Sequence, residues 1–401
     1  MGLPPTDTGN RVLDWIGDRI WDVMHFERRF DPFLRPYFDA LLRDKLTQLV
    51  TDQMNRGRRD EGLKLAEERI QPNEEEDIQA IIDAFNAQMR RLWNPYHFER
   101  GGNTKTHGVV RAEFTVRDDV PEHMRRGIYA TPATYRAWVR YSGPGPYITP
   151  DIDDVGFMSM SIKLMGVPGP KLLEDEKFTQ DMFGVSPPTF VTADVHSNAQ
   201  LQRWSYKNAA AFHFVNFTAP HFLDGIMQAL WTKTQTSPLE HQYFSCVPYL
   251  LGEGQAMQYS FRSRLGFRTK VPGLPGRPPD NYLRDAMVAT LARQDVEFDI
   301  LLQVQTDPFL MPIENNAVLW PTRLSPRVPV AVVRIPRQKF DSPEQLAFAR
   351  VLTYNPWHSL PEHRPLGNQS RARKRMYYEL SRLRQKMNNV EHYEPTGDET
   401  F

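Results

Sequence analysis

Two residues near the end of the chain have the types and spacing needed to hold a metal. Arg350 and Tyr354 stand four positions apart in ARVLTYNPWHSLPEHRPLG, residues 349–367. On a helix such residues share a face, and a guanidinium held against a phenol oxygen stabilises the phenolate and lowers its pKa. A phenolate is a hard anionic ligand suited to ferric iron, and tyrosine is one of the axial ligands of haem. The alternative is an ordinary aromatic residue at the end of an amphipathic helix.

The residues before this pair predict the helix that has to carry them. Ser342 can cap it, Pro343 fits the first helical position, and Gln345 would complete a capping box. The helix should end at or before Asn355, because Pro356 disfavours helical geometry in the residue preceding it. Arg350 and Tyr354 are therefore expected on one face of its last turns.

The first ninety or so residues have helical periodicity. Asn73 is an expected cap for a helix whose apolar positions recur at steps of three and four, namely Ile78, Ile81, Ile82, Phe85, Met89 and Leu92. Segments 11–26 and 36–50 carry similar stripes that are rich in aromatic residues. Such stripes can bind a partner or a membrane surface, but packing in a core is their commoner role.

The hydrophobic period changes to two at about residue 105. Seven alternating segments indicate strands: 109–116, 135–142, 157–167, 189–195, 256–264, 296–306 and 328–336. They lack the regular helical spacing of a parallel sheet, so we expect an antiparallel barrel. Helical character returns at about 343 and again over 370–388.

Composition and charge exclude several classes of protein. Lysine and arginine number 49, as do aspartate and glutamate, and this balance argues against a nucleic-acid or anionic-membrane binder. Cys246 is the one cysteine, so no disulfide can form within the chain. No apolar run reaches the roughly 18 residues of a membrane span, and the start lacks a signal-peptide layout. We interpret the opening MGLPPT, which fits a loose myristoylation pattern, as chance, and expect a cytoplasmic protein.

The segment around Arg350 and Tyr354 resembles the proximal haem helix of catalases. It is still more similar to small catalase-related proteins of bacteria and fungi, through Asn-Pro-Trp-His and His-Arg-Pro-Leu-Gly. Further similar motifs occur in the family's order and together span roughly residues 95–385: KTHGVVRAEFTV, TYRAWVRYSG, SIKLMGVPG, TQDMFGVSPPTFV, YFSCVPYLLGEGQAMQYSFR and MPIENNAVLWP.

This resemblance implies an α+β chain with a catalase-like antiparallel β-barrel core, a helical N-terminal extension and C-terminal helices. The extension covers 1–94, the barrel haem domain 95–340, and the proximal helix with the C-terminal helical segment 341–401. A homo-oligomer is compatible with it.

The resemblance also implies haem b, with Tyr354 as the iron ligand supported by Arg350. Arg100, Arg140 and Arg364 occupy positions similar to the family's propionate-binding arginines, although ordinary salt bridges are the alternative for each. Phe190 is expected to face the distal pocket or to be a core phenylalanine.

Both residues expected on the distal side of the haem depart from the catalase pattern. Asn103, between Arg100 and Lys105, stands where catalases have a histidine, and Ser186 stands where they have an asparagine. An amide does not titrate, so it cannot replace the histidine as a general base toward hydrogen peroxide.

An amide can still orient a bound hydroperoxide. The expected function is therefore conversion of small-molecule peroxides, chiefly organic (fatty-acid) hydroperoxides, by peroxidase, isomerase or lyase chemistry, as in catalase-related allene oxide synthases. Catalase activity would be weak or absent. The alternatives are a haem-binding sensor or scaffold without turnover, and a conventional catalase that uses His107. His358 and His363 are expected to brace the loop after Tyr354.

Overall fold

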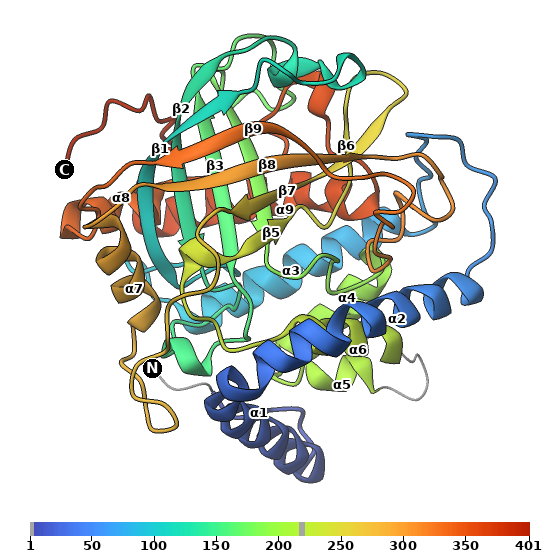
Figure 1. Ribbon diagram of the computed structural model, residues 1–401. Helices are drawn as coiled ribbons and strands as arrows, with labels where there is room; N and C mark the ends of the chain where they lie inside the picture. The colour runs from blue at the N-terminus through green and yellow to red at the C-terminus, as the bar shows by residue number, and fades with distance from the viewer. Residues whose placement is uncertain (1–3, 216–220) are drawn as a thin grey trace.

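A closed antiparallel barrel forms the centre of the computed structural model, which describes residues 4–215 and 221–401 (Figure 1). In these residues the sheet order is β5-β4-β3-β2-β1-β9-β8-β7-β6, and pairing of β5 with β7 closes the barrel and leaves β6 outside the closed ring. The strands are β1 Thr106–Val116, β2 Thr134–Ser142, β3 Ser159–Met165, β4 Thr179–Val185, β5 Gln242–Phe244, β6 Tyr249–Leu250, β7 Ala256–Ser263, β8 Val296–Val304 and β9 Val328–Ile335.

Alternation along the strands separates a filled interior from an outer face that carries polar residues. Val110, Val139, Ile162 and Met182 are cross-strand neighbours from β1 to β4, and all four are buried in the main hydrophobic core. The neighbouring row of cross-strand partners, Val109↔Arg140↔Ser161↔Phe183, has its side chains on the other face of the sheet. This outer face of β1–β4 is the surface on which the candidate site is built.

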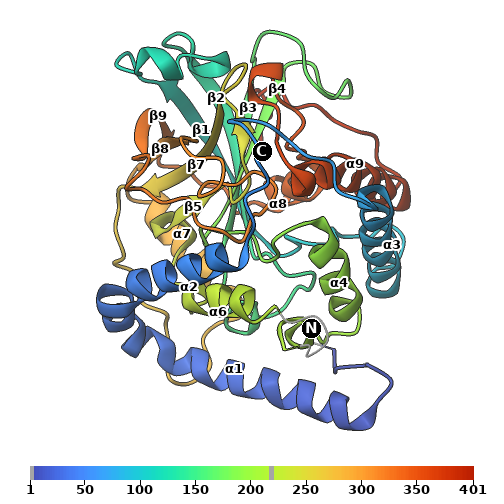
Figure 2. The same cartoon turned by 90° about the vertical axis from the view of Figure 1, so that its right-hand side faces the viewer.

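Helices surround the barrel on two sides. They are α1 Arg11–Phe38, a π-helical turn Asp39–Arg43, α2 Asp44–Gly57, α3 Glu74–Leu92, α4 Val195–Ser205, α5 Ala211–Phe214, α6 Phe222–Trp231, α7 Tyr282–Leu291, α8 Pro343–Val351 and α9 Asn368–Asn388. Helices α3, α4 and α9 pack together through a small apolar cluster that includes Ile81, Ala199 and Ala372. Helix α1 lies along the lower edge of the molecule (Figure 2). No helix within the described ranges combines the length and apolarity needed to cross a bilayer.

The barrel and the flanking helices expected from the sequence are confirmed, with local errors. Segment 189–195 was expected to be a strand and is instead a run of bends that leads into α4. Asp194 accepts a hydrogen bond from the backbone N–H of Ser197, and this capping box starts a helix where alternation predicted a strand. Asn73 does precede α3, but its backbone is left-handed (φ 62°) and its side chain does not cap the helix.

Candidate functional site

Helix α8 begins as predicted but ends too early to place Arg350 and Tyr354 on one face. Ser342 Oγ accepts a hydrogen bond from the Gln345 N–H at 3.1 Å, whereas the Gln345 side chain donates to the carbonyl of Val109 on β1. The helix ends at Val351, and Leu352 has extended geometry (φ −50°, ψ 137°). The predicted i,i+4 pairing of Arg350 with Tyr354 is therefore wrong, because the chain leaves the helix three residues before the tyrosine.

Arg350 lies at the protein surface and pairs with an acid. Its guanidinium forms an ion pair with Glu99, and its side chain is 47% exposed. Tyr354 is buried, and the charges that act most on its phenol are those of other residues. The structure thus gives Arg350 no contact through which it would support a phenolate.

Tyr354 lies directly against the outer face of the barrel. Its ring meets the ring of Phe183 edge-on, with centroids 6.3 Å apart, and Lys163 Nζ lies 5.4 Å from its centroid. Its hydroxyl is buried without a hydrogen-bond partner among the described residues. Burial raises the pKa of Tyr354, an effect that Lys163, Arg140 and Arg100 only partly offset, so the phenol is neutral at physiological pH. The sequence had predicted a lowered pKa.

Three arginines gather beside Tyr354: Arg140 and Arg384 are buried, and Arg100 is half-buried. Burial lowers the pKa values of Arg100, Arg140 and Arg384, and their mutual repulsion lowers those of Arg140 and Arg384 further. Glu99 is the carboxylate that acts on all three, and it already pairs with Arg350. The cluster therefore carries an excess of buried positive charge, which is the property of a site for an anionic group.

Part of this charge stabilises the end of α8. Arg100 and Arg384 both donate hydrogen bonds to the carbonyl of Leu352, where the negative end of the helix dipole lies. Arg140 donates to the backbone carbonyl of Asn103 at 2.7 Å. Two donor atoms, Nη1 of Arg100 and Nε of Arg140, are nevertheless buried without a partner in the described chain.

The two expected distal residues differ in what their side chains do. Asn103 has a left-handed backbone (φ 52°), and its Oδ1 is buried without a partner among the residues described. Ser186 Oγ accepts a hydrogen bond from the Met158 N–H at 3.0 Å and so ties the end of β4 to the approach to β3. Asn103 is thus available to a ligand, whereas the hydroxyl of Ser186 is already engaged by the backbone.

His107 is a buried, neutral histidine on β1. Burial lowers its pKa well below the ordinary value, and Lys105, Arg284 and Arg140 act in the same direction. Its Nδ1 lies 3.7 Å from Asp151 Oδ1, a carboxylate that pairs with Lys105 at 2.6 Å. His107 therefore belongs to an internal polar group next to Arg140.

The remaining two predicted residues lie in other surroundings. Phe190 is half-buried and packs against the main barrel core, as its core interpretation expected. Arg364 donates to Glu68 at 2.6 Å, within an ionic network that also contains Arg371. With its guanidinium paired, Arg364 does not join the three arginines beside Tyr354.

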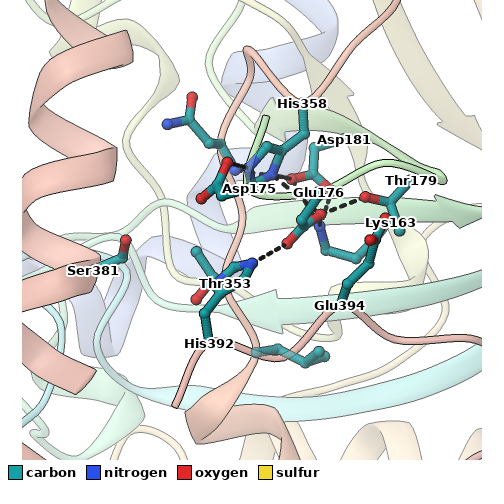
Figure 3. Close-up of polar contacts among 12 residues, drawn as sticks. Lys163, Asp175, Glu176, Thr179, Asp181, Thr353, His358, Ser381, His392 and Glu394 are labelled. Atoms are coloured by element: carbon teal, nitrogen blue, oxygen red, sulfur yellow. Dashed lines mark hydrogen bonds and ion pairs between the residues drawn. The ribbon is translucent and has the colours of Figure 1, made fainter. Parts of the chain in front are cut away.

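A buried ionic cluster that the sequence did not predict fixes the segment after Tyr354 (Figure 3). Lys163 on β3 pairs with Glu176 and with Asp181 on β4. Asp181 Oδ2 accepts hydrogen bonds from the Asn355 N–H at 2.8 Å and from His358 Nδ1 at 2.9 Å. This cluster therefore attaches the chain on the C-terminal side of Tyr354 to the outer barrel face.

His358 is the cation of this cluster that can titrate. Burial acts to lower its pKa, but hydrogen bonds to Asp175 (3.0 Å) and Asp181 outweigh burial and raise the pKa to about 9. His363 is different: burial lowers its pKa to about 4, and its Nε2 accepts a hydrogen bond from the Ile128 N–H. Both histidines brace the loop after Tyr354, as expected, one charged and one neutral.

Glu176, Asp181 and His358 also have the spacing of a metal-ligand group. Lys163 Nζ already lies between the two carboxylates, and both ring nitrogens of His358 contact carboxylate oxygens. A lysine thus occupies the position that a metal cation would need. The sequence signal for this cluster was Lys163 itself, a charged residue within the apolar run FMSMSIKLMGV.

Comparison with known proteins supports the fold and leaves the activity open. No family model and no curated protein matches the chain. Among solved structures it is similar to a fungal catalase (TM-score 0.58, 15% identity, covering 79% of this chain and 65% of that one). It is also similar to catalase A from Saccharomyces cerevisiae (0.59, 12%, 79% and 67%) and to a bacterial catalase (0.50, 16%, 84% and 67%). At these identities the similarity establishes a catalase-like fold, in a chain that spans about two thirds of each catalase.

Proposed function

We propose that this chain binds haem on the outer face of β1–β4 and acts on peroxides, chiefly organic hydroperoxides. One observation carries the proposal. Four buried polar atoms without partners in the described residues, Tyr354 Oη, Arg100 Nη1, Arg140 Nε and Asn103 Oδ1, belong to four residues that the resemblance assigns to the haem site. Buried atoms without partners also occur elsewhere in the described residues, so the support comes from the grouping of these four. Arg100 and Arg140 both act on the phenol of Tyr354, and Arg140 donates to the carbonyl of Asn103, so one ligand could supply all the missing partners.

The side chains of the site have the donor atoms that haem b needs, but the structure leaves no gap wide enough for the porphyrin. Tyr354 offers an oxygen ligand, and Arg100 and Arg140 offer guanidiniums to the propionates; Arg350 and Arg364 are already paired with Glu99 and Glu68. The Tyr354 ring, however, packs directly on Phe183 and Lys163. A porphyrin needs van der Waals contact of roughly 3.5 Å on each of its faces. Binding therefore requires the segment that carries Tyr354 to move away from the barrel.

The two cavities described in the structure do not supply this space. One of about 10 Å³ lies beside Tyr282, and one of about 460 Å³ lies between α7 and Phe340. Neither is lined by Tyr354, Asn103 or Ser186. Haem binding is therefore the first property to measure.

When bound, the haem would supply a redox-active iron that cleaves the O–O bond of a peroxide. Tyr354 has to lose its proton to act as the ligand, and Arg100 and Arg140 both favour that loss. The Asn103 amide can hydrogen-bond one oxygen of a hydroperoxide but cannot carry its proton to the other oxygen. This limitation favours organic hydroperoxides that rearrange or are reduced over the disproportionation of hydrogen peroxide.

The test is the absorption spectrum of the haem-loaded protein, followed by its activity on two peroxides. Protein reconstituted with haem should show a high-spin ferric spectrum that Tyr354→Phe abolishes. Tyr141→Phe is the matched control, because it removes another buried hydroxyl, from the barrel interior, that has no partner among the described residues. Oxygen release from hydrogen peroxide and loss of diene absorbance from a fatty-acid hydroperoxide then separate the activities. Absence of a Soret band, or equal loss in both variants, would refute the proposal.

A haem protein without turnover is the second candidate. It is favoured by the engagement of Ser186 Oγ with the backbone and by the amide at position 103, which leave no titrating side chain among the expected distal pair. This candidate predicts the same spectrum with no conversion of either oxidant. A conventional catalase would instead need His107 as its base, and His107→Gln should then abolish oxygen release.

A further inference from the structure

The side of helix α1 that contacts the protein combines partly buried apolar residues, such as Trp21 and Met24, with buried charged ones. Arg28 and Asp31 on this side are buried. Asp31 Oδ2 accepts a hydrogen bond from the Thr234 N–H at 2.7 Å, and Arg35 Nη1 donates to the carbonyl of Thr232 at 2.6 Å. The side of α1 that contacts the protein is therefore held by hydrogen bonds and charges.

The opposite side of α1 is apolar and exposed. It carries Val12, Trp15, Val23, Phe26, Phe30, Phe33, Leu34 and Tyr37, which we call the α1 stripe. A surface helix normally turns its apolar residues inward, whereas α1 has apolar residues on both sides and leaves the α1 stripe exposed. Figure 2 shows α1 along the edge of the molecule, and the side chains of the stripe are 40–71% exposed. An exposed stripe of this kind is expected when another surface covers it.

The stripe is large enough to be an interface. Trp15, Phe26 and Tyr37 are 64%, 65% and 71% exposed. With about 200 Å² per aromatic side chain, its five aromatic residues alone expose roughly 600 Å². This equals the largest apolar patch of an ordinary monomer, and the aliphatic members extend it toward the roughly 800 Å² that each partner buries in a stable complex.

The spacing of the stripe fits another helix. Val23, Phe26, Phe30, Phe33 and Tyr37 follow one another at steps of three, four, three and four. An average step of 3.5 residues is the repeat by which two helices keep apolar side chains along a common seam. Leu41, Leu42 and Leu49, in the π-helical turn and in α2, are exposed as well.

The charges of α1 favour a protein over a membrane as the partner. Its 28 residues contain five arginines, five acidic residues and no lysine, so its net charge is zero. Helices that lie on anionic membranes carry a surplus of basic residues. Arg19 and Asp22 instead form an exposed ion pair (2.8 Å) between Trp15 and Val23 of the stripe, a pattern suited to a mixed-charge partner.

We propose that the α1 stripe is the contact surface for a second copy of this chain, with α1 packed against α1 about a two-fold axis. Identical surfaces meet in such a dimer, so one mutation changes both sides of the contact. This proposal is independent of haem binding.

Sedimentation of the full-length chain tests it. The wild type should have the mass of a dimer at micromolar concentration, and the double variant Phe26→Glu/Phe33→Glu should have half that mass with an unchanged circular dichroism spectrum. Phe178→Glu is the control, because this ring is 64% exposed outside α1. A monomeric wild type, or a folded double variant that remains a dimer, would overturn the proposal.

A cross-linking experiment keeps the test decisive if the double variant unfolds. Cys246 is buried, so Val23→Cys introduces the only accessible thiol on the chain. A short thiol cross-linker should join two copies of this variant but not two copies of Tyr96→Cys, which is exposed elsewhere. Failure to cross-link Val23→Cys counts against the dimer. So does a monomer that co-sediments with vesicles of phosphatidylcholine and phosphatidylglycerol through α1.

Discussion

Replacing His358 with glutamine should remove a specific part of the pH dependence of stability. His358 is buried between Asp175 and Asp181, and its pKa is raised to about 9 in the folded protein. In the unfolded chain the pKa is the ordinary 6.5. Since the folded state holds the proton more tightly, protonation of His358 stabilises the fold.

The difference between the two pKa values sets the magnitude. Each pKa unit corresponds to about 1.4 kcal/mol, so the contribution is roughly 3 kcal/mol. It is fully present below pH 6.5 and is lost as the pH rises through 9. Among the described histidines this is the one whose pKa is clearly raised; burial lowers the pKa of His363, for example, to about 4. The window from pH 6.5 to 9 therefore separates His358 from the histidines with lowered pKa values.

Urea unfolding at several pH values measures the effect. The free energy of unfolding of the wild type should fall by roughly 3 kcal/mol more than that of His358→Gln between pH 6.5 and 9. His363→Gln is the matched control, because that histidine is neutral throughout the window and its replacement should leave the slope unchanged. Parallel curves for the wild type and His358→Gln would refute the assignment of a charged His358.

Three further changes test neighbouring residues. Lys163→Met should destabilise the protein by about 3–5 kcal/mol in urea unfolding, because it removes the lysine that pairs with both buried carboxylates, Glu176 and Asp181. Tyr354→Phe should stabilise the cofactor-free protein by about 1 kcal/mol in the same assay, since it removes a buried hydroxyl without a partner in the described residues; a loss of stability would reveal a partner. Asn103→His should increase oxygen release from hydrogen peroxide by tenfold or more, because histidine tolerates the left-handed backbone there and supplies a base; unchanged release would place position 103 away from the reaction.

The sequence predicted the long strands of the barrel better than the short strands β5 and β6. Strands β7, β8 and β9 match segments with clear alternation, which reports one face buried in the core. Strands β5 and β6, at Gln242–Phe244 and Tyr249–Leu250, are too short for alternation to show. Their existence depends on pairing with β7, a tertiary contact that no local pattern contains.

The sequence could indicate positions in the candidate site for residues on or beside the barrel strands, but not for residues near the end of α8. Arg140 on β2 and Asn103 just before β1 lie next to each other, and the resemblance assigned both residues to the haem site. The error at Arg350 came from assuming that α8 continues to Tyr354. The helix instead ends where Arg100 and Arg384, distant in sequence, bind its last carbonyls, and spacing along the chain cannot show this.

The charge state of Tyr354 depends on which of two groups of neighbours prevails. Asp181, which fixes Asn355, opposes ionisation of the phenol, while Arg100, Arg140 and Lys163 favour it. Burial outweighs these cations, so without a cofactor the residue behaves as a neutral core tyrosine. A bound metal ion is usually the largest local charge and reverses such a balance. Under the proposed haem binding, the same phenol would be a packing residue in the empty protein and an anionic ligand in the loaded one, and the arginines that share the single carboxylate of Glu99 in the first state would gain the propionates in the second.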